Sequence, residues 1–501
     1  MHMPAEYTMT LHDLRFDNAW ATLPDDFFTR VMPTPWSGTR ILDISPLGAD
    51  QLGLDVDALW RDENEHAALT ALMAGRELLS GMDPIAQKYT GHQFGSYNPA
   101  LGDGRGLLLG EAVTGHSFVD LHLKGAGQTP YSRFGDGRAV LRSSIREYLA
   151  GEAMAGLGIP TTTALAVAVN DEKVMRERVE PGATLLRLAE SHVRFGHFEW
   201  LYQRQRPEDM KRLAWHVIDR YRPSLRDANA PLEALFADTV ARTADLVAAW
   251  QAYGFVHAVM NTDNMSLLGL TIDYGPYAFM DRYQPRLVPN HTDTEGRYAF
   301  NQQPGVALWN LAVLAQSLTP LIDVERLRET LDTFEPRLQA TYARQMRNRM
   351  GLACEREEDH ELVSSWLALL EKHGADFHGA FLALGDYDGT ATTIEKVANA
   401  LECAPDEASL QQWLQRYAER LEHETRTHRQ RHADMASVNP RYVLRTHLAQ
   451  SVIESAEAGD SEPLQTFRQL LADPFTEHPG YEAWQQAPSR NAPPVCLSCS
   501  S

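Results

Sequence analysis

An acid–amide pair and a second acid lie close together near the middle of the chain, in the stretch NTDNMSLLGLTIDYG at residues 261–275. Asp263 and Asn264 form the pair, and Asp273 follows nine positions after Asn264. Carboxylate and amide oxygens are hard ligands that suit Mg²⁺. The same residue types also favour tight turns, because Asn and Asp side chains bond to nearby backbone groups. The stretch is therefore a candidate metal cradle, with an ordinary turn as the alternative.

The spacing around this cradle is typical of a nucleotide-binding site. Protein kinases carry a His seven residues before a metal-binding Asn, in the pattern H-R-D-x-x-x-x-N, and a further Asp begins the motif D-F-G. Here His257 precedes Asn264 by seven residues, and Asp273 begins Asp-Tyr-Gly. The catalytic acid of that pattern would fall at Val259, whose side chain can neither accept nor hold a proton. Asp263 is the nearest acid that could replace it.

A glycine-rich stretch, a lysine and a glutamate precede the cradle in the order that a kinase-like site would need. Gly102 and Gly104 lie in GDGRG, where backbone N–H groups could approach phosphates, although a plain hairpin turn has the same composition. Lys124 ends the strand-like FVDLHLKG and could bind phosphate, or could simply be exposed. Glu147 could hold that lysine. Alternatively, Ser144 and Glu147 form an S-x-x-E capping box.

Positive charge gathers between the lysine and the glutamate. Residues 124–146 contain five basic residues and one acid, Asp136, within a chain whose net charge is −21. Farther on, Arg187 and Arg194 could bind phosphate through their planar guanidinium groups, although surface ion pairs are the simpler interpretation of each. The local excess predicts an anion-binding site.

Hydrophobic periodicity predicts the elements that must position these residues. The Gly-rich stretch and the strands come first, a helix follows, and the second half is helical almost throughout. The expected strands cover 107–111, 118–124 and 161–169, and the expected helices cover 143–156 and 232–253, with Gly254 as a helix stop.

The order of these elements predicts an α+β, protein-kinase-like fold of two lobes, with an N-terminal extension and a helical C-terminal region. The tail after about residue 485 is rich in Pro and Ser and is expected to be mobile. The predicted units are an extension over 1–85, an N-lobe with the Gly-rich loop and Lys124 over 86–180, a C-lobe with the metal site over 181–345, and a helical region over 346–501.

Composition narrows the class of protein. The chain has 501 residues, of which 44% are hydrophobic, so it can bury a large core. Its acidity disfavours nucleic-acid binding, which depends on neutralising phosphates. No apolar run approaches the ~18 residues of a membrane span, and the N-terminus has no signal-peptide pattern. A cytoplasmic protein is expected. Four cysteines do not make a disulfide scaffold, and Cys496 and Cys499 form a C-x-x-C at the tip, where a reversible disulfide is expected.

Taken together, these residues resemble the selenoprotein O family, also called YdiU, of pseudokinase protein adenylyltransferases. The resemblance runs along nearly the whole chain. The blocks that carry it are LRFDNAW, KYTGHQFGSYNPALGDGRGLLLGE, LHLKGAGQTPYSRFGDGRAVLRSSIREYLAGEAMAGLGIPTT, GFVHAVMNTDNMSLLGLTIDYGPYAFMD and NPRYVLR.

The resemblance implies a kinase-like fold that binds ATP in a flipped orientation and transfers AMP to Ser, Thr or Tyr hydroxyls of proteins. It implies that Glu147 pairs with Lys124, that Asn264 and Asp273 hold Mg²⁺, and that Asp263 is the base. Some bacterial relatives use UTP with Mn²⁺, so a uridylyltransferase is an alternative. The phosphate-binding set implied is Gly102, Gly104, Arg105, Lys124, Asp136, Gly137, Arg187 and Arg194.

Two further alternatives come from other functional classes. One is a protein or small-molecule kinase that uses Asp263, and Val259 argues against it. The other is a nucleotide-binding scaffold without catalysis. Retention of both metal ligands, Asn264 and Asp273, argues against that interpretation.

Overall fold

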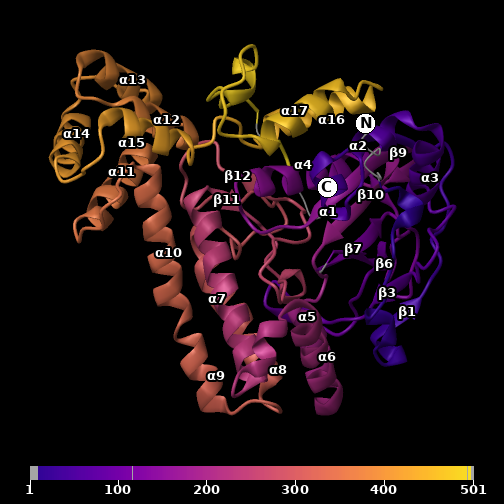
Figure 1. The fold of residues 1–501 in the computed structure, drawn as a ribbon. Helices are drawn as coiled ribbons and strands as arrows, with labels where there is room; N and C mark the ends of the chain where they lie inside the picture. The colour runs from indigo at the N-terminus through magenta and orange to yellow at the C-terminus, as the bar shows by residue number, and fades with distance from the viewer. Residues whose placement is uncertain (1–8, 116, 494, 498–501) are drawn as a thin grey trace, which may run out of the picture.

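The computed structural model describes residues 9–115, 117–493 and 495–497. A sheet and its helices form one side of the molecule in Figure 1, and long helices form the other side. The last helices, α16 and α17, return across the top to lie beside α4. The predicted mixture of strands and helices is confirmed, with an antiparallel sheet and a helix-rich second half.

Eight strands of the described chain form one sheet, and each pairing within it is antiparallel. The order across the sheet is β1-β3-β6-β7-β10-β9-β2, and β8 pairs with β10. Residues before β3 therefore supply both edge strands. The strands are β1 (Phe28–Arg30), β2 (Arg40–Ile44), β3 (Ile85–Gln87), β6 (Gly106–Thr114), β7 (Ser117–Lys124), β8 (Ala139–Val140), β9 (Thr163–Met175) and β10 (Val179–Ala189).

Alternation along the strands decides which side chains face the site. Leu121 and Leu123 of β7 belong to a core shared with α1 (Pro46–Leu52), α2 (Val56–Arg61) and α3 (Glu63–Met73). Because successive side chains on a strand point to opposite faces, Lys124 lies on the other face.

That other face is covered by α4. The helix spans Leu141–Gly156 and shares a core with Leu185 of β10. Arg187 is two residues along the same strand, and alternation therefore places it on the α4 face with Lys124. The period-two pattern thus brings two cations from neighbouring strands beside one helix.

The second half of the chain is helical and contains two hydrophobic cores. The first is continuous with the α4 side of the sheet, and the second is formed by α11 to α15. The helices are α5 (Phe195–Gln203), α6 (Pro207–Tyr221), α7 (Pro231–Ala252), α8 (Gln303–Leu318), α9 (Val324–Leu331), α10 (Phe334–Arg349), α11 (Asp359–His373), α12 (Phe377–Asp386), α13 (Ala391–Leu401), α14 (Ala408–Leu421), α15 (His428–Ala436), α16 (Thr446–Glu457) and α17 (Glu462–Ala472).

Two small hairpins complete the fold near the site. One pairs β4 (Gly91–Gln93) with β5 (Ser96–Asn98), and the other pairs β11 (Phe255–Val256) with β12 (Ala278–Phe279). In the described part of the chain, no helix combines the length and the apolar character needed to cross a membrane.

The predicted unit boundaries fall inside elements. The boundary at residues 85 and 86 lies within β3, that at 180 and 181 within β10, and that at 345 and 346 within α10. The polypeptide therefore passes from one predicted unit to the next without a linker at these points, and the four units remain a prediction.

The C-terminal tail contacts the rest of the protein at Leu497, while most of the described residues between 486 and 496 are exposed or half-buried, and the expected mobility of the tail stays a prediction. Leu497 is buried, and its carbonyl accepts a hydrogen bond of 3.0 Å from the backbone N–H of His291. Cys496 is exposed as a free thiol. Cys499 lies outside the described residues, so the expected Cys496–Cys499 pair stays a prediction.

Candidate functional site

A cavity of about 680 Å³ brings the predicted site residues together from distant parts of the chain. Its wall includes the Gly-rich loop before β6, the end of β7, the 131–138 loop, and the 259–276 segment. Glu147 is set behind the wall, where it pairs with Lys124. The predicted residues that line the cavity are Gly102, Gly104, Arg105, Lys124, Asp136, Gly137, Arg187, Arg194, Asp263, Asn264 and Asp273.

A continuous chain of ion pairs runs through the floor of this cavity. The Lys124 ammonium contacts one oxygen of Glu147, and Arg187 Nη2 lies 2.6 Å from the other, Oε1. The same Arg187 nitrogen lies 2.9 Å from Asp273 Oδ1, and Arg194 binds Asp273 Oδ2. Arg194 also donates a 2.7 Å hydrogen bond to the backbone oxygen of Asp263. Three cations and two carboxylates are thus held as one buried network.

Burial and these partners set the charges of the network. Burial lowers the pKa of Lys124 to about 8, although the Glu147 carboxylate opposes the shift. Burial alone would raise the pKa of Asp273, but Arg194 and Arg187 outweigh it and hold that pKa well below its usual range. Arg187 and Lys124 likewise keep the pKa of Glu147 lowered against burial. Both acids are therefore ionised at neutral pH.

Glu147 does not serve as a helix cap. The helix α4 begins at Leu141 with Val140 as its N-cap, so Ser144 lies inside the helix rather than at its start. The capping-box alternative is therefore wrong. Glu147 lies in the second turn of α4, and its carboxylate instead contacts Lys124 and Arg187.

The Gly-rich loop is fixed by the segment that follows β7. Gly102 has φ +150°, and a Cβ there would lie 2.5 Å from the Tyr131 ring, so only glycine fits. Thr129 Oγ1 donates a 2.6 Å hydrogen bond to the carbonyl of Asp103, and Ser132 Oγ donates to the carbonyl of Gly104. These bonds hold the loop against the cavity without using its N–H groups.

Asp136 reaches the cavity through a partner that the sequence did not predict. Its two carboxylate oxygens each accept a 2.8 Å hydrogen bond from Arg176, which lies between β9 and β10 and lines the same cavity. A carboxylate repels phosphate, so its direct effect on an anion is unfavourable. Asp136 positions the Arg176 guanidinium, and Arg138 adds another cation to this wall.

The metal-cradle residues adjoin the ion-pair network, since Arg187 and Arg194 both contact Asp273. Asn264 donates its side-chain N–H to the carbonyl of Val259 at 2.9 Å, which leaves its amide oxygen as the available ligand. Asp273 adopts φ +59°, a left-handed conformation that is strained for a non-glycine residue and that clusters at functional sites.

Asp263 completes an oxygen-rich corner. Its Oδ1 is buried and has no hydrogen-bond partner among the residues that the structure describes. Asp263, Asn264 and Asp273 line the same cavity, and their carboxylate and amide oxygens are the donor types that Mg²⁺ or Mn²⁺ prefers. The residues therefore fit a divalent cation of this class.

Asp263 also has the protonation behaviour expected of a base. Burial raises its pKa to about 7, although Arg194 opposes the shift. Gln93 Nε2, from β4, lies 3.3 Å from Asp263 Oδ2. A carboxylate with a pKa near neutrality can accept a proton and release it again at physiological pH.

Several cavity residues were not predicted from the sequence. Tyr89 is one of them, and its ring lies under Arg194, with 5.0 Å between the guanidinium carbon and the ring centroid. His122, two residues before Lys124 on β7, lies 3.5 Å from the Asp103 carboxylate. Strand alternation could have indicated His122, because residues two apart share a face. Asp103 could have been indicated by its place within GDGRG, whereas Tyr89 carried no comparable signal.

The chain is similar to known proteins along nearly its whole length. The model of a family described as protein adenylyltransferase SelO matches residues 10–472. A relative from Chromohalobacter salexigens, named protein nucleotidyltransferase YdiU, is 66% identical over 499 residues, covering 99% of each chain. Proteins of the same name from Pseudomonas aeruginosa PAO1 and Vibrio atlanticus are 46% and 45% identical, covering 98% and 97% of this chain and 100% and 99% of theirs.

Proposed function

The chain belongs to the SelO family of protein adenylyltransferases, and from that premise we propose that it transfers AMP from ATP to Ser, Thr or Tyr hydroxyls of proteins. The observation that carries the proposal is the cavity itself. It combines a buried network of cations with an adjoining set of oxygen donors, and Val259, which also lines it, stands where the kinase pattern would have an acid.

We also propose that the fold is kinase-like, with ATP bound between the sheet and the helical half. The features that support this are the Lys124–Glu147 pair between β7 and α4, and the presence of Asn264 and Asp273 in the lining of the same cavity. In this arrangement, residues 86–180 are the N-lobe and residues 181–345 the C-lobe.

The cations of the cavity bind the triphosphate. Lys124, Arg187 and Arg194 are held by acids at one end, so their orientation is fixed before the nucleotide arrives. Fixed, partly desolvated charges stabilise developing charge more strongly than mobile ones in water. Arg105 and Arg176 line the more open part of the wall and neutralise further phosphate charge.

Asn264 and Asp273 would hold the divalent cation. When bound, Mg²⁺ neutralises phosphate charge and favours departure of pyrophosphate. Arg187 and Arg194 contact the two oxygens of Asp273. These arginines keep the carboxylate ionised and therefore ready to act as a ligand.

Asp263 acts on the hydroxyl of the acceptor protein. Its carboxylate orients the protein hydroxyl and takes its proton as the oxygen attacks the α-phosphorus. The bond from the α-phosphorus to the bridging oxygen breaks, and pyrophosphate leaves with the electron pair. A kinase would attack the γ-phosphorus instead, with an acid at position 259 orienting the hydroxyl.

The choice of nucleotide, ATP or UTP, is tested separately from the type of reaction. The family description specifies adenylyl transfer, whereas the relatives are named only as nucleotidyltransferases. We therefore expect intact-protein mass spectrometry to show addition of AMP after incubation with ATP and Mg²⁺, and no faster addition of UMP from UTP and Mn²⁺. Addition of UMP alone would replace ATP by UTP in this proposal. Addition of a single phosphate would refute nucleotidyl transfer.

A further inference from the structure

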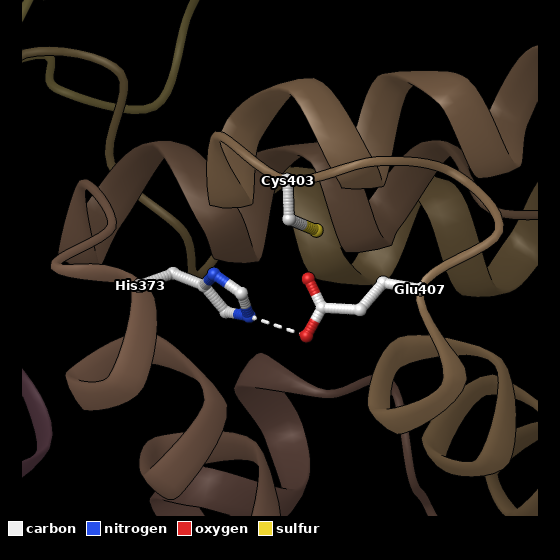
Figure 2. Close-up of side chains that lie close together, drawn as sticks. All are labelled: His373, Cys403 and Glu407. Carbon is white, nitrogen blue, oxygen red and sulfur yellow. Dashed lines mark ion pairs between the residues drawn. The ribbon is translucent and has the colours of Figure 1, made fainter.

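Three side chains of metal-ligating type meet in the α11–α15 region, away from the cavity described above. They are His373, Cys403 and Glu407, and Figure 2 shows their polar ends pointing toward one another. One potential ligand atom of each residue lies within 4.8 Å of those of the other two. They do not line the nucleotide cavity.

The local fold brings three helix ends together at this point. His373 is the last residue of α11, and Gly374 follows with φ +56°, a left-handed conformation that ends the helix. Cys403 lies two residues after α13, and its N–H bonds to the carbonyl of Ala398 at 3.0 Å. Glu407 is the N-cap of α14. Helix capping therefore fixes all three backbones.

The environment of the cluster favours a cation. The His373 side chain is 13% exposed, and its Nε2 lies 3.2 Å from Glu407 Oε1. This contact is an ion pair by distance but lacks hydrogen-bond geometry, and Nε2 makes no hydrogen bond to any residue within the described ranges. Cys403 is a free, half-buried thiol packed against the core of α11–α15. The C-terminal ends of α11 and α13 add partial negative charge from their carbonyls.

Lys372 also contacts Glu407, but through only one of the two carboxylate oxygens. Lys372 Nζ lies 2.5 Å from Glu407 Oε1, and Ser409 Oγ donates to the same oxygen at 2.7 Å. These contacts and the His373 contact all use Oε1, so Oε2 can serve as the ligand. The Lys372 side chain is 54% exposed and can move into solvent.

We propose that His373, Cys403 and Glu407 bind one Zn²⁺ ion, with water as the fourth ligand. Sulfur, imidazole nitrogen and carboxylate oxygen are the three ligand types that Zn²⁺ accepts in tetrahedral sites. The ligand atoms, which now lie within 4.8 Å of one another, must approach to separations of roughly 3.5 Å, given bond lengths of about 2.0–2.3 Å. On binding, the Cys403 thiol proton passes to solvent, and the ion joins the ends of α11 and α13 to the start of α14.

The test uses the full-length protein after removal of metals with a chelator. Zn²⁺ is titrated against a chromophoric chelator, and Co²⁺ is then added as a spectroscopic probe of thiolate ligation. We expect one tight equivalent of Zn²⁺ and a thiolate-to-cobalt charge-transfer band. Cys403→Ala should lose both, and His373→Ala should weaken binding by at least about tenfold.

Matched variants separate this site from other thiols and from misfolding. Cys354→Ala removes another free cysteine and should leave binding unchanged. The tail variant Cys496→Ser/Cys499→Ser should also retain the band. Lys372→Met should tighten binding severalfold, because it removes the competing ammonium, and this gain cannot come from a damaged fold.

Three results would overturn the proposal. The first is that the wild-type protein shows no thiolate-to-cobalt band. The second is that the band remains in Cys403→Ala. The third is that the band is lost in the tail variant Cys496→Ser/Cys499→Ser. The Lys372→Met arm is independent of the ligand deletions, so unchanged or weaker binding in that variant would also count against the site. Nucleotidyl transfer serves only as a check that each variant is folded.

Discussion

Replacing Glu147 by Gln tests whether the buried ion-pair network prepares Lys124 for a phosphate. The substitution keeps the size of the side chain and removes its charge. Glu147 is 3% exposed and contacts both Lys124 and Arg187. Arg187 keeps Asp273 as a second partner, whereas Lys124 has Glu147 as its one ion-pair partner in the described chain. The effect should therefore fall mainly on the lysine.

The magnitude follows from the forces on Lys124. Burial already lowers its pKa to about 8, and the attraction of Glu147 is the main influence in the opposite direction. Without that attraction, burial and the nearby Arg105 and Arg187 should lower the pKa further, so a larger fraction of the amine should be neutral at physiological pH than in the wild type. Above the new pKa, each pH unit removes about tenfold of the protonated form, worth about 1.4 kcal/mol. Loss of a buried partner also costs roughly 3–5 kcal/mol of folding stability.

The assay is ATP binding by calorimetry between about pH 6 and pH 9, with folding checked at each pH. Wild-type affinity should begin to fall only above about pH 8, whereas Glu147→Gln should fall about tenfold per unit from near neutrality. Lys124→Met should bind weakly at every pH, and the double variant should match it. An affinity profile of Glu147→Gln that coincides with the wild-type profile would refute the role assigned to this network.

Three further predictions concern separate parts of the molecule. Asp263→Asn should slow single-turnover labelling by roughly 10²–10⁴-fold while ATP affinity changes little, and an equal loss of affinity would contradict its role as base. Arg176→Ala should weaken ATP binding about tenfold or more, as measured by calorimetry, because a hydrogen bond to a charged group is worth about 1.5–3 kcal/mol; unchanged affinity would remove Arg176 from the site. Burial raises the pKa of Glu152 from 4.5 to about 7, so the folded state retains a proton that the unfolded chain releases. The free energy of unfolding should therefore fall by up to roughly 3 kcal/mol as the pH rises through this range. Urea unfolding of Glu152→Gln should show a pH dependence that is smaller than that of the wild type by this amount, with the remainder coming from groups such as Asp263, whereas the exposed control Glu454→Gln should keep the wild-type dependence.

Local pattern was enough to predict the elements that carry the site. The strand expected at 118–124 is β7, and the helix expected at 143–156 lies within α4. Because strand alternation and helix position are properties of the local sequence, they place Lys124 and Glu147 opposite each other. The spacing of Asn264 and Asp273 likewise predicted that both would line one cavity, which they do.

Contacts between residues far apart in the sequence could not be predicted from local sequence pattern. Arg176 lies 40 positions from Asp136, in a β9–β10 connection whose register no local signal specifies. The edge strands β1 and β2 are three and five residues long, too short for a clear alternation, and their pairing depends on the finished sheet. Arg187 bridges two acids because three elements converge there, so its two partners could not be predicted from spacing.

The fate of the ATP phosphates tests the central claim most directly. Protein incubated with Mg²⁺ and ATP labelled at either the α or the γ phosphorus is separated from free nucleotide, and the bound label is counted. The account predicts transfer of the α label with release of γ-labelled pyrophosphate, and loss of transfer in Asp273→Ala. Transfer of the γ label, with ADP as the product, would mean that an ordinary kinase reaction occurs despite Val259 and would contradict the account.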